Sequence, residues 1–477
     1  MGRRIAALLT LLSVTLLATL APTASLAGRS NDAQPPIFYQ SPTPLHAPPG
    51  FSAGSRQVTA MIELSEPAAL LAPTPAEIVA RSRQIVAKQA TLQMGMTALG
   101  ARVLFQTSLA YNGIAVAVDA RQLDRLRALP GVAGVHVIPL KQRSNADAVP
   151  FIGAPAVWSA PHGATGSGIR IGVVDSGIDY THADFGGPGT PTAYAGNNRT
   201  ILEPGTFPTA KVFGGIDLAG DAYDAANADP TRRIPHPDPD PLDCNGHGTH
   251  VAGTAAGFGV AADGTTYHGP YVSGVDFSAF RVGPGVAPEA QLYALKVFGC
   301  NGSTALMTLA VERAIDPNGD GDPSDHLDVL NISVGSPFGS DDDPDAVAVD
   351  NAVRAGVVVV AAVGDTGNTF YATDSPASAQ LAISVGAAFD AARATPATPA
   401  DSLPTFTSRG PQRGNGALKP DLVAPGVALR SADVGSGTGA FTMGGTSTAA
   451  PQVAGAAALL RQLHAHWTPE QIKAALM

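Results

Sequence analysis

The alternation of apolar and polar positions over residues 57–139 predicts a small domain of strands and helices. Runs rich in β-branched residues predict strands, and apolar residues at helical spacing predict helices. The expected strands cover residues 57–64, 113–118 and 132–139, and the expected helices cover residues 76–99 and 121–129. This β-α-β-α-β succession indicates a small split β-α-β domain. An unrelated N-terminal binding module is the alternative.

From about residue 146 the pattern changes to continuous apolar runs that alternate with helical segments. The expected strands cover residues 170–174, 291–297, 329–332 and 357–362, and the expected helices cover residues 247–256, 303–315 and 345–355. Continuous apolar runs are typical of parallel strands buried on both faces. We therefore expect an α/β domain, a doubly wound, mostly parallel sheet with helices on both faces. Ligands bind at the carboxyl ends of such strands, so polar residues that follow the strands are the first candidates for a site.

The first 27 residues predict a secretory signal peptide. Arg3 and Arg4 precede an apolar run over residues 5–20, and the small residues Ser25 and Ala27 stand where a signal peptidase would cut. A membrane anchor is the alternative, but the run is shorter than the roughly 20 residues that a spanning helix needs. We expect a secreted, extracellular protein that has no membrane partner.

Charge and cysteine content narrow the function classes further. The formal net charge is -10, and no basic stripe suggests a nucleic-acid partner. Cys244 and Cys300 are the only cysteines in the sequence. In an oxidising compartment they form either one disulfide or two buried thiols, and a zinc site would need more ligands at close spacing.

Three segments place a reactive side chain at the end or the beginning of an element. Asp175 ends an apolar strand and precedes Ser-Gly, which could also be a simple turn. His247 opens a small-residue helix, where an imidazole can take and return a proton; a metal pair with His250 is the alternative. Ser447 precedes the small-residue helix expected over 452–460, where unpaired N–H groups can bind an oxyanion, and an N-cap serine is the alternative.

Together these segments resemble the subtilisin family of serine peptidases, in the order Asp, His, Ser. The resemblance runs from about residue 146 to the end of the chain. It includes the further motifs GVAP at 285–288, LKV at 295–297, FTSRGP at 406–411 and KPDLVAPG at 419–426. It implies that Asp175 orients and charges the imidazole, that His247 is the general base and acid, and that Ser447 forms an acyl-enzyme.

The resemblance also implies a precursor made of three parts. These are a signal peptide over 1–27, a propeptide over 28–145 and a peptidase domain over 146–477. The propeptide would be a ferredoxin-like inhibitor and chaperone over about 56–140, removed by self-processing near Lys141 to Asp147. The expected partners are protein or peptide substrates and the protein's own propeptide, and we expect a monomer. The chain stops inside a helix that begins near Thr468, so we expect the peptidase domain to be truncated there.

Two segments resemble the edges that bind the substrate main chain in this family. Gly302 and Ser303 lie on one expected edge, and Ser333 and Gly335 lie on the other. Exposed backbone groups there would add the substrate as a strand. The alternative is that both segments are plain loops.

Two acidic residues depart from the family pattern. Asp365 stands where the family has an asparagine that donates to the oxyanion, and an ionised aspartate cannot donate. We hypothesise that Asp365 is protonated when substrate excludes water; the competing function is a weakly active or inactive binding protein. Asp374 stands near the base of the P1 pocket, where a buried negative charge would favour Lys or Arg; a surface-loop aspartate is the alternative.

An acidic loop predicts a structural calcium site. Oxygen ligands alternate at Asp316, Asn318, Asp320 and Asp322, although Leu327 replaces the bidentate glutamate of a full calcium loop. A solvated acidic turn is the alternative. The chemistry itself requires no cofactor.

Overall fold

The computed structural model describes residues 57–137 and 151–477, except residues 392, 396 and 397. The chain divides into two units, Met1–Pro49 and Gly50–Met477, and all described residues belong to the second. The predicted signal peptide, residues 1–27, and the predicted cleavage region, Lys141 to Asp147, lie outside the described residues. Both therefore stay predictions.

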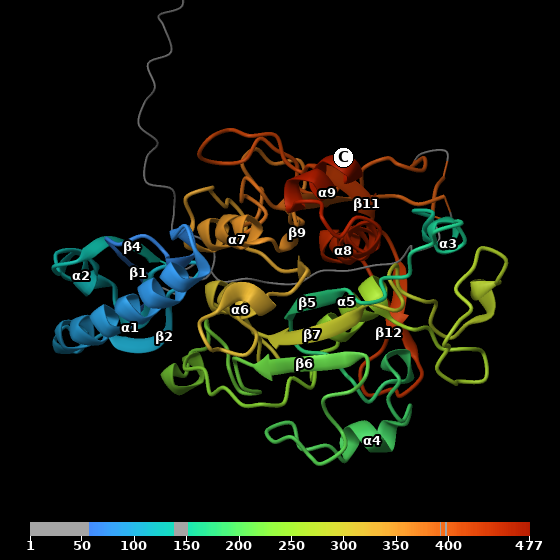
Figure 1. The fold of residues 1–477 in the computed structure, drawn as a ribbon, viewed down its shortest axis with the longest axis horizontal. Helices are drawn as coiled ribbons and strands as arrows, with labels where there is room; N and C mark the ends of the chain where they lie inside the picture. The colour runs from blue at the N-terminus through green and yellow to red at the C-terminus, as the bar shows by residue number, and fades with distance from the viewer. Residues whose placement is uncertain (1–56, 138–150, 392, 396–397) are drawn as a thin grey trace, which may run out of the picture. The chain divides into compact units, whose positions relative to one another are not determined.

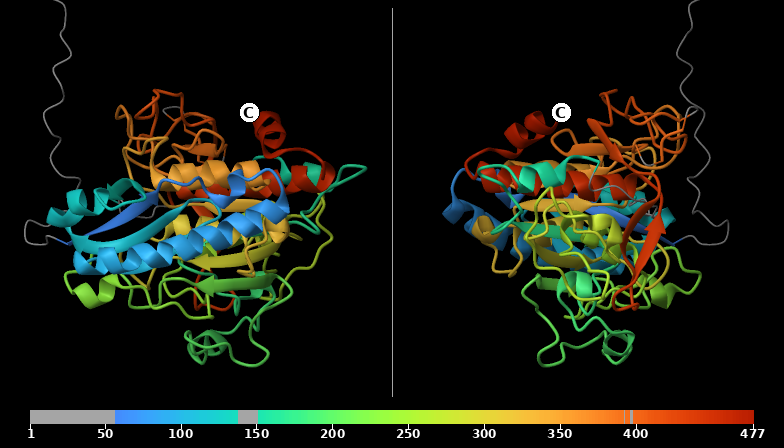
Figure 2. Two further views of the ribbon diagram at one scale, coloured as in Figure 1. Left: turned by 60° about the vertical axis from the view of Figure 1, so that its left-hand side comes forward. Right: turned by 90° about the vertical axis from the view of Figure 1, so that its right-hand side faces the viewer.

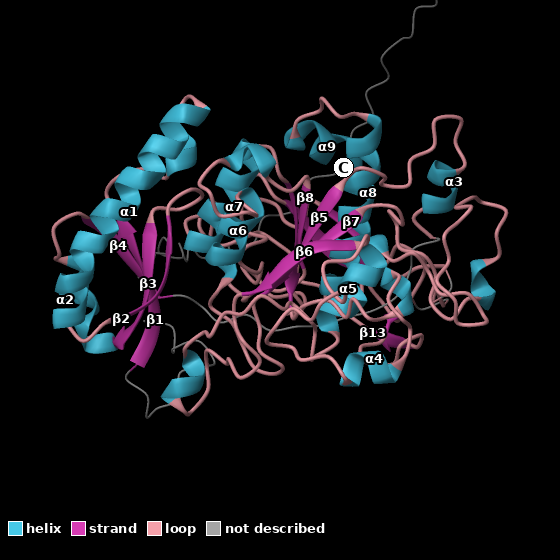
Figure 3. Ribbon diagram, turned by 60° about the horizontal axis from the view of Figure 1, so that its bottom comes forward, coloured by secondary structure: helices cyan, strands magenta, loops and turns pink. Residues whose placement is uncertain are grey.

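The N-terminal part of the described chain forms an antiparallel four-stranded sheet in the order β2-β3-β1-β4 (Figure 3). Its elements are β1 (Gln57–Leu64), α1 (Pro75–Ala98), β2 (Arg102–Thr107), β3 (Gly113–Asp119), α2 (Leu123–Arg127) and β4 (Val132–Val137). This β-α-β-β-α-β order is the ferredoxin-like one. The prediction lacked strand β2, because that strand begins only four residues after α1 and carries polar side chains among its apolar ones.

The two faces of this small sheet pack against different partners. Ala60 and Ile62 of β1 join a core with Met96 of α1 and Leu126 of α2, and Figure 2 shows the long helix α1 lying along the sheet. Met61, between them in sequence, belongs instead to a cluster that includes residues of the large domain. Because successive strand residues point to opposite faces, Met61 lies on the second face, in a cluster that joins Ile85 of α1 to residues of the large domain.

The large domain contains a seven-stranded sheet in the order β11-β10-β9-β8-β5-β7-β6, in which every pairing is parallel (Figure 1). Its strands are β5 (Arg170–Asp175), β6 (Val212–Asp217), β7 (Gln291–Lys296), β8 (Val329–Ile332), β9 (Val358–Ala362), β10 (Ile383–Ala388) and β11 (Leu422–Pro425). The predicted α/β sheet is confirmed. Strands β6, β10 and β11 were not predicted; two glycines interrupt the apolar run of β6, and β11 has only four residues.

Helices cover both faces of this sheet. The helices are α3 (Ala154–Trp158), α4 (Pro191–Ala195), α5 (His247–Ala256), α6 (Met307–Ile315), α7 (Pro344–Ala355), α8 (Thr446–Leu463) and α9 (Pro469–Leu476), and a hairpin joins β12 (Leu429–Ala432) to β13 (Ala440–Met443). Ile171 and Val173 of β5 pack in a cluster with α5 and α8, whereas Val174 packs in a cluster with α6 and α7. The alternation along β5 thus places one helix pair on each face.

Two helices begin four or more residues away from their predicted first residue. Helix α8 begins at Thr446 rather than Gln452, so Ser447 lies in its first turn. The predicted helix starts directly after Pro451, and Pro451 lies inside the observed helix although a proline lacks the N–H that would bond to the carbonyl four residues earlier. Helix α6 begins at Met307 rather than Ser303, and the residues before it form an irregular segment.

Candidate active site

Asp175 and His247 form a buried pair at the carboxyl edge of the sheet. Asp175 is the last residue of β5, and His247 is the first residue of α5. The imidazole Nδ1 lies 2.7 Å from Oδ1 and 2.6 Å from Oδ2 of Asp175. The backbone N–H of Ser176 donates a further hydrogen bond of 2.7 Å to Oδ1. A carboxylate at Nδ1 fixes the proton on that nitrogen and leaves Nε2 to act as the base.

Small residues allow the two segments of this pair to approach closely. A β-carbon on Gly248 would lie 2.2 Å from the carbonyl oxygen of Gly177, so no other residue fits there without movement. The N–H of Gly248 donates to Ser176 Oγ at 2.9 Å. The glycines on either side of the pair therefore serve the contact between β5 and α5.

Asp243, which the sequence analysis did not single out, holds the beginning of helix α5. Its Oδ2 accepts hydrogen bonds from the N–H groups of Gly246 and Thr249, both at 3.0 Å. A carboxylate beside the first N–H groups of a helix satisfies donors that have no partner within the helix. Asp243 thus fixes the backbone that carries His247. Its position in the sequence, four residues before His247, was the signal from which this role could have been predicted.

Ser447 is buried in the first turn of α8, with 3% of its surface exposed. Helices α5 and α8 pack against each other. Asp365 relates their first turns, because it accepts a hydrogen bond from the N–H of Thr446 and the charge of His247 acts to lower its pKa. Two N–H groups of the first turn of α8 already have acceptors: Thr446 donates to Asp365 Oδ1 at 2.9 Å, and Thr448 donates to the carbonyl oxygen of Gly445 at 3.4 Å.

Asp365 lies three residues beyond β9 and contacts the turn that carries Ser447. Its Oδ1 accepts a hydrogen bond of 2.9 Å from the N–H of Thr446. The preceding residue, Gly364, donates from its N–H to Thr446 Oγ1 at 3.1 Å. Burial raises the pKa of Asp365, although the hydrogen bonds from Thr446 and the charge of His247 act to lower it. The structure thus places this carboxyl beside the nucleophile turn, with its protonated form favoured by burial.

His250 has a structural place in helix α5. It is fully buried, and its Nε2 donates to the carbonyl oxygen of Leu429 at 3.1 Å. Burial lowers its pKa to about 3, so it stays neutral. Among the described residues, the metal-ligating side chains that lie close enough together to share an ion are Asp221, Cys244 and Cys300. Both sulfurs of that group are in a disulfide, so these three residues do not make a metal site.

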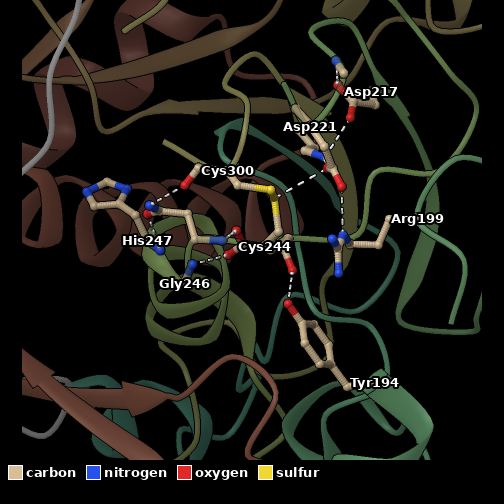
Figure 4. Close-up of a disulfide and its surroundings, with 12 residues drawn as sticks. Tyr194, Arg199, Asp217, Asp221, Cys244, Gly246, His247 and Cys300 are labelled. Carbon is tan, nitrogen blue, oxygen red and sulfur yellow. Dashed lines mark hydrogen bonds and ion pairs between the residues drawn. A yellow bond between two sulfur atoms is a disulfide. The ribbon is translucent and has the colours of Figure 1, made fainter. Parts of the chain in front are cut away.

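The disulfide between Cys244 and Cys300, one of the two predicted states, is present (Figure 4). It joins the segment before His247 to the segment after β7. Asn245 Nδ2 donates to the Cys300 carbonyl oxygen at 3.0 Å and so adds a second connection. The disulfide therefore couples the histidine loop to the edge that carries Gly302.

A buried ion-pair network supports the same region (Figure 4). Lys296, at the end of β7, is fully buried and lies 2.6 Å from Asp217 and 2.7 Å from Asp221. Arg199 lies 2.8 Å from the other oxygen of Asp221. Burial acts to raise the pKa of Asp221, but Lys296 and Arg199 outweigh it and lower that pKa. The Asp221 carbonyl accepts from the N–H of Cys300, so the network also positions the disulfide.

Loss of the disulfide is expected to destabilise the protein. The bridge closes a loop with a sequence separation of 56, for which chain entropy predicts about 4 kcal/mol of stabilisation. The paired replacement Cys244→Ser and Cys300→Ser, made in a Ser447→Ala background to prevent autolysis, should lower the free energy of unfolding by about that amount. Urea titration followed by tryptophan fluorescence measures it. An unchanged midpoint and slope would contradict the expectation.

The structure reduces the candidate residues of the first predicted substrate edge from two to one. The N–H of Ser303 donates to Asp224 Oδ1 at 3.0 Å, and its carbonyl accepts from the N–H of Ala225. We expected Ser303 to offer its backbone to a substrate. Both its N–H and its carbonyl instead have partners within the protein. Gly302 is exposed and remains a candidate. The sequence could not reveal this, because Asp224 lies 79 residues away from Ser303.

The second predicted edge lies at the end of β8. Ser333 directly follows the strand and is buried, with its Oγ accepting from Asn331 Nδ2 at 2.8 Å. Gly335 faces the side chain of Asp374: a β-carbon on this glycine would lie 2.8 Å from Asp374 Oδ2. Asp374 is 8% exposed and so is not the surface-loop residue of the alternative interpretation.

The side chains of the acidic loop make hydrogen bonds with the backbone of the loop itself. Asp316 turns its carboxylate inward, where it accepts from the N–H groups of Gly319, Asp320 and Gly321. Among the described residues, Asp316, Asp320 and Asp322 do not bring their carboxylate oxygens together as ligands of one ion would require. The loop residues Asn318, Asp320 and Asp322 accept hydrogen bonds from backbone N–H groups two positions later. Calcium binding stays a prediction that these contacts do not favour.

The fold and the site together define a class of protein. One edge of the parallel α/β sheet carries a buried aspartate-imidazole pair and a serine in the first turn of a helix, which is the arrangement of serine hydrolases. The family is more specific. Residues 166–477 match the model of the subtilase family, Peptidase_S8, and the chain belongs to that family. It is accordingly a serine-type endopeptidase, which is a hydrolase.

The chain is similar to several curated bacterial proteases. It is 32% identical over 329 residues to serine protease AprX of Bacillus subtilis (strain 168). The aligned region covers 65% of this chain and 60% of AprX. It is 31% identical over 369 residues to subtilisin E of the same strain, covering 76% of this chain and 74% of the relative. It is also 31% identical over 396 residues to the extracellular serine proteinase of Thermus sp. (strain Rt41A), covering 79% and 73%. The helices of the described residues include none with the length and apolar character needed to cross a bilayer.

Proposed function

We propose that this chain is the precursor of a secreted serine endopeptidase that cleaves protein substrates through an acyl-enzyme. The observation that carries the proposal is the buried contact of 2.6 Å between Asp175 and His247, beside the helix turn that holds Ser447. Labelling of Ser447 by a fluorophosphonate tests it, because such a reagent reacts with a serine that a neighbouring base activates.

The proposed mechanism moves one proton along a line of three side chains. Ser447 Oγ attacks the substrate carbonyl while His247 Nε2 takes its proton, and the Asp175 carboxylate stabilises the resulting imidazolium. The N–H of Ser447, in the first turn of α8, donates to the oxyanion. His247 then gives the proton to the leaving amine, which departs as the acyl-enzyme forms. Water, activated by the same imidazole, hydrolyses the ester and restores Ser447.

The proposal of secretion rests on the sequence and on the relatives. Residues 1–27 have the charged start, apolar run and small cleavage residues of a signal peptide. One of the similar proteins, from Thermus, is named an extracellular serine proteinase. A disulfide at Cys244 and Cys300 suits an oxidising compartment.

The proposal of an inhibitory propeptide draws support from contacts between the small sheet and helix α6. Glu312 of α6 accepts three hydrogen bonds, from the N–H groups of Ser108 at 2.5 Å, Leu109 at 2.6 Å and Ala110 at 2.8 Å. Asn351 of α7 donates to the Ala110 carbonyl at 2.6 Å. A carboxylate that receives three N–H groups is a strong, oriented contact. A domain held in this way can template the folding of the large domain and then remain bound to it.

Asp365 favours a second candidate function, a weakly active or inactive binding protein. An ionised carboxylate beside the developing oxyanion would repel it and donate nothing. The pair of Asp175 and His247 argues against this candidate, because an inactive protein has no need of a buried proton relay. Absence of fluorophosphonate labelling at Ser447 would favour the binding protein.

We propose further that the neutral form of Asp365 donates to the oxyanion. A carboxylic acid is protonated below its pKa, so the raised pKa of Asp365 extends its donor form toward neutral pH. The donor is lost as pH rises through that pKa. Activity should therefore be higher on the acidic side of the Asp365 pKa than on its alkaline side.

The variant Asp365→Asn is expected to keep its activity at alkaline pH, where the wild type loses the donor to the oxyanion. Its amide donates at every pH, so at alkaline pH the variant should exceed the wild type in kcat/KM by about 100-fold, the size of one oxyanion donor in enzymes of this family. At acidic pH the two should converge. Rates on one peptide substrate from about pH 5 to 10 measure this. The control Asp365→Ala, which has no donor, should stay slow throughout; parallel profiles for wild type and Asp365→Asn would refute the proposal.

A further inference from the structure

Asn301 and Gly302 form an exposed pair between two fixed points of the chain. Cys300, directly before them, is held by its disulfide (Figure 4), and Ser303, directly after them, donates its N–H to Asp224 Oδ1 at 3.0 Å. Both residues of the pair are exposed. In the described part of the chain, neither the side-chain amide of Asn301 nor the N–H of Gly302 has a hydrogen-bond partner. These two groups are therefore free to react with each other.

The fold requires a glycine at position 302. A β-carbon there would lie 2.3 Å from Cγ and 2.5 Å from Oδ1 of Asp224. The φ angle of Gly302 is 98°, in the region that favours glycine. Because glycine has no β-carbon, its nitrogen is the least hindered of all residues in an attack on the side chain that precedes it. The packing against Asp224 thus keeps the most reactive neighbour beside Asn301.

The Asn-Gly sequence occurs at four other places, and hydrogen bonds restrain all four of these asparagines. They are Asn112, Asn245, Asn318 and Asn415. In this order, their side-chain Nδ2 atoms donate to the Glu66 carbonyl at 2.8 Å, the Cys300 carbonyl at 3.0 Å, Asp320 Oδ2 at 3.1 Å and Asp341 Oδ2 at 2.9 Å. The N–H groups of Gly246 and Gly319 also donate to carboxylates. Among the described residues, Asn301 is the Asn-Gly asparagine that no such bond restrains.

We propose that Asn301 is a site of spontaneous deamidation. The nitrogen of Gly302 loses its proton and attacks Cγ of the Asn301 side chain. A bond from Cγ to this nitrogen forms, the bond from Cγ to Nδ2 breaks, and Nδ2 leaves as ammonia with the proton. Water then opens the resulting cyclic imide, at the side-chain carbonyl to give aspartate or at the main-chain carbonyl to give isoaspartate. The reaction consumes water and needs no oxidant or reductant.

The modification changes the first substrate edge, on which Gly302 is the remaining candidate residue. Both products add a negative charge directly before Gly302. Isoaspartate also carries the main chain through the former side chain, so it inserts one extra carbon atom between Cys300 and Gly302. Because Cys300 and Ser303 are fixed by the contacts above, the extra length displaces Gly302. The position of the substrate main chain therefore changes with it.

Incubation of the folded precursor at mildly alkaline pH tests the proposal. The chain carries Ser447→Ala to prevent self-cleavage, and peptide mapping by mass spectrometry measures aspartate and isoaspartate at each Asn-Gly sequence. Asn301 should convert on the order of tenfold faster than Asn245, Asn318 or Asn415, because each of these must first break a hydrogen bond. In the urea-denatured chain all of them should convert at similar rates, since these bonds are absent.

The variant Asn301→Gln is the matched control. It keeps an amide at this position, but its longer side chain does not form the same ring with Gly302. The variant should lose the conversion at position 301 and keep the slow conversion at the other Asn-Gly sequences. Conversion of Asn301 no faster than that of Asn318 in the folded protein would overturn the proposal. Conversion of Asn301 far slower in the folded than in the denatured chain would equally overturn it.

The effect on activity rests on the proposed function and has a separate readout. Wild-type protein is incubated in the same way, and its kcat/KM on a peptide is divided by its rate of labelling with a simple fluorophosphonate. This ratio should fall on the order of tenfold in the converted wild type, because the substrate edge moves and Ser447 does not. It should stay constant in Asn301→Gln.

The outcomes separate the modification from the proposed function. A constant ratio in fully converted wild type would overturn the effect on the substrate edge. Failure of the fluorophosphonate to label fresh protein would overturn the proposed function and, with it, the effect on activity. The conversion of Asn301 itself is decided by mass spectrometry alone, on a chain without the nucleophile.

Discussion

The variant Ser447→Ala should lose peptide hydrolysis by on the order of a million-fold, which is the loss that subtilisin itself shows when its nucleophilic serine is removed. Without the hydroxyl, His247 has no nucleophile from which to take a proton, and no acyl-enzyme forms. Fluorophosphonate labelling should disappear completely, and the precursor should accumulate uncut if its maturation is self-catalysed.

A second buried serine provides the control for this result. Ser431 of β12 is as deeply buried as Ser447, at 2% against 3% exposed, and Ser431→Ala should retain labelling at Ser447. Circular dichroism on Ser447→Ala should match the wild-type precursor, because one hydroxyl is lost and the helix remains. Residual labelling of the alanine variant at the wild-type rate would refute the assignment of Ser447 as nucleophile.

The candidate residues that the sequence predicted share a local signal. Asp175 ends a strand whose apolar run is visible, and His247 and Ser447 lie where small residues open a helix. Each motif is contiguous, so it can be recognised without knowing what lies opposite in space. The same holds for most of the α/β sheet, since buried parallel strands are continuous apolar runs.

The features that the sequence did not predict depend on partners far away in the chain. Asp224 removes the backbone of Ser303 from the substrate edge across 79 residues, and Asp221 meets Lys296 across 75 residues. Strand β6 is recognisable only through its pairing with β7, since its glycines hide its pattern. Such contacts come from topology, and no local pattern contains them.

The acidic loop shows that one local pattern is compatible with two roles. Alternating oxygen side chains at Asp316 to Asp322 are typical of a calcium loop and equally typical of successive Asx turns. In the structure the carboxylate of Asp316 serves the backbone of its own loop. Which of the two roles a carboxylate takes depends on where the backbone N–H groups point, and that information is three-dimensional.

The variant Asp175→Asn should lower turnover by about 10⁴-fold while leaving the fold intact. Nδ1 of His247 lies 2.6 Å from Asp175 Oδ2, where a carboxylate accepts the proton of that nitrogen. An asparagine amide can donate to Nδ1 instead, which moves the imidazole proton to Nε2 and removes the base. The loss of charge also leaves the imidazolium of the transition state without its buried counter-ion.

A second buried aspartate distinguishes this effect from general destabilisation. Asp240 is also fully buried and accepts from the Tyr180 hydroxyl at 2.9 Å, without a contact to His247 among its described hydrogen bonds. Asp240→Asn should therefore keep kcat within about threefold, whereas Asp175→Asn should lose kcat with little change in KM, because substrate binding does not use the carboxylate. Stopped-flow or burst kinetics on one peptide ester measure both parameters. Equal losses in the two variants would mean that Asp175 acts through folding alone and would remove it from the proton relay.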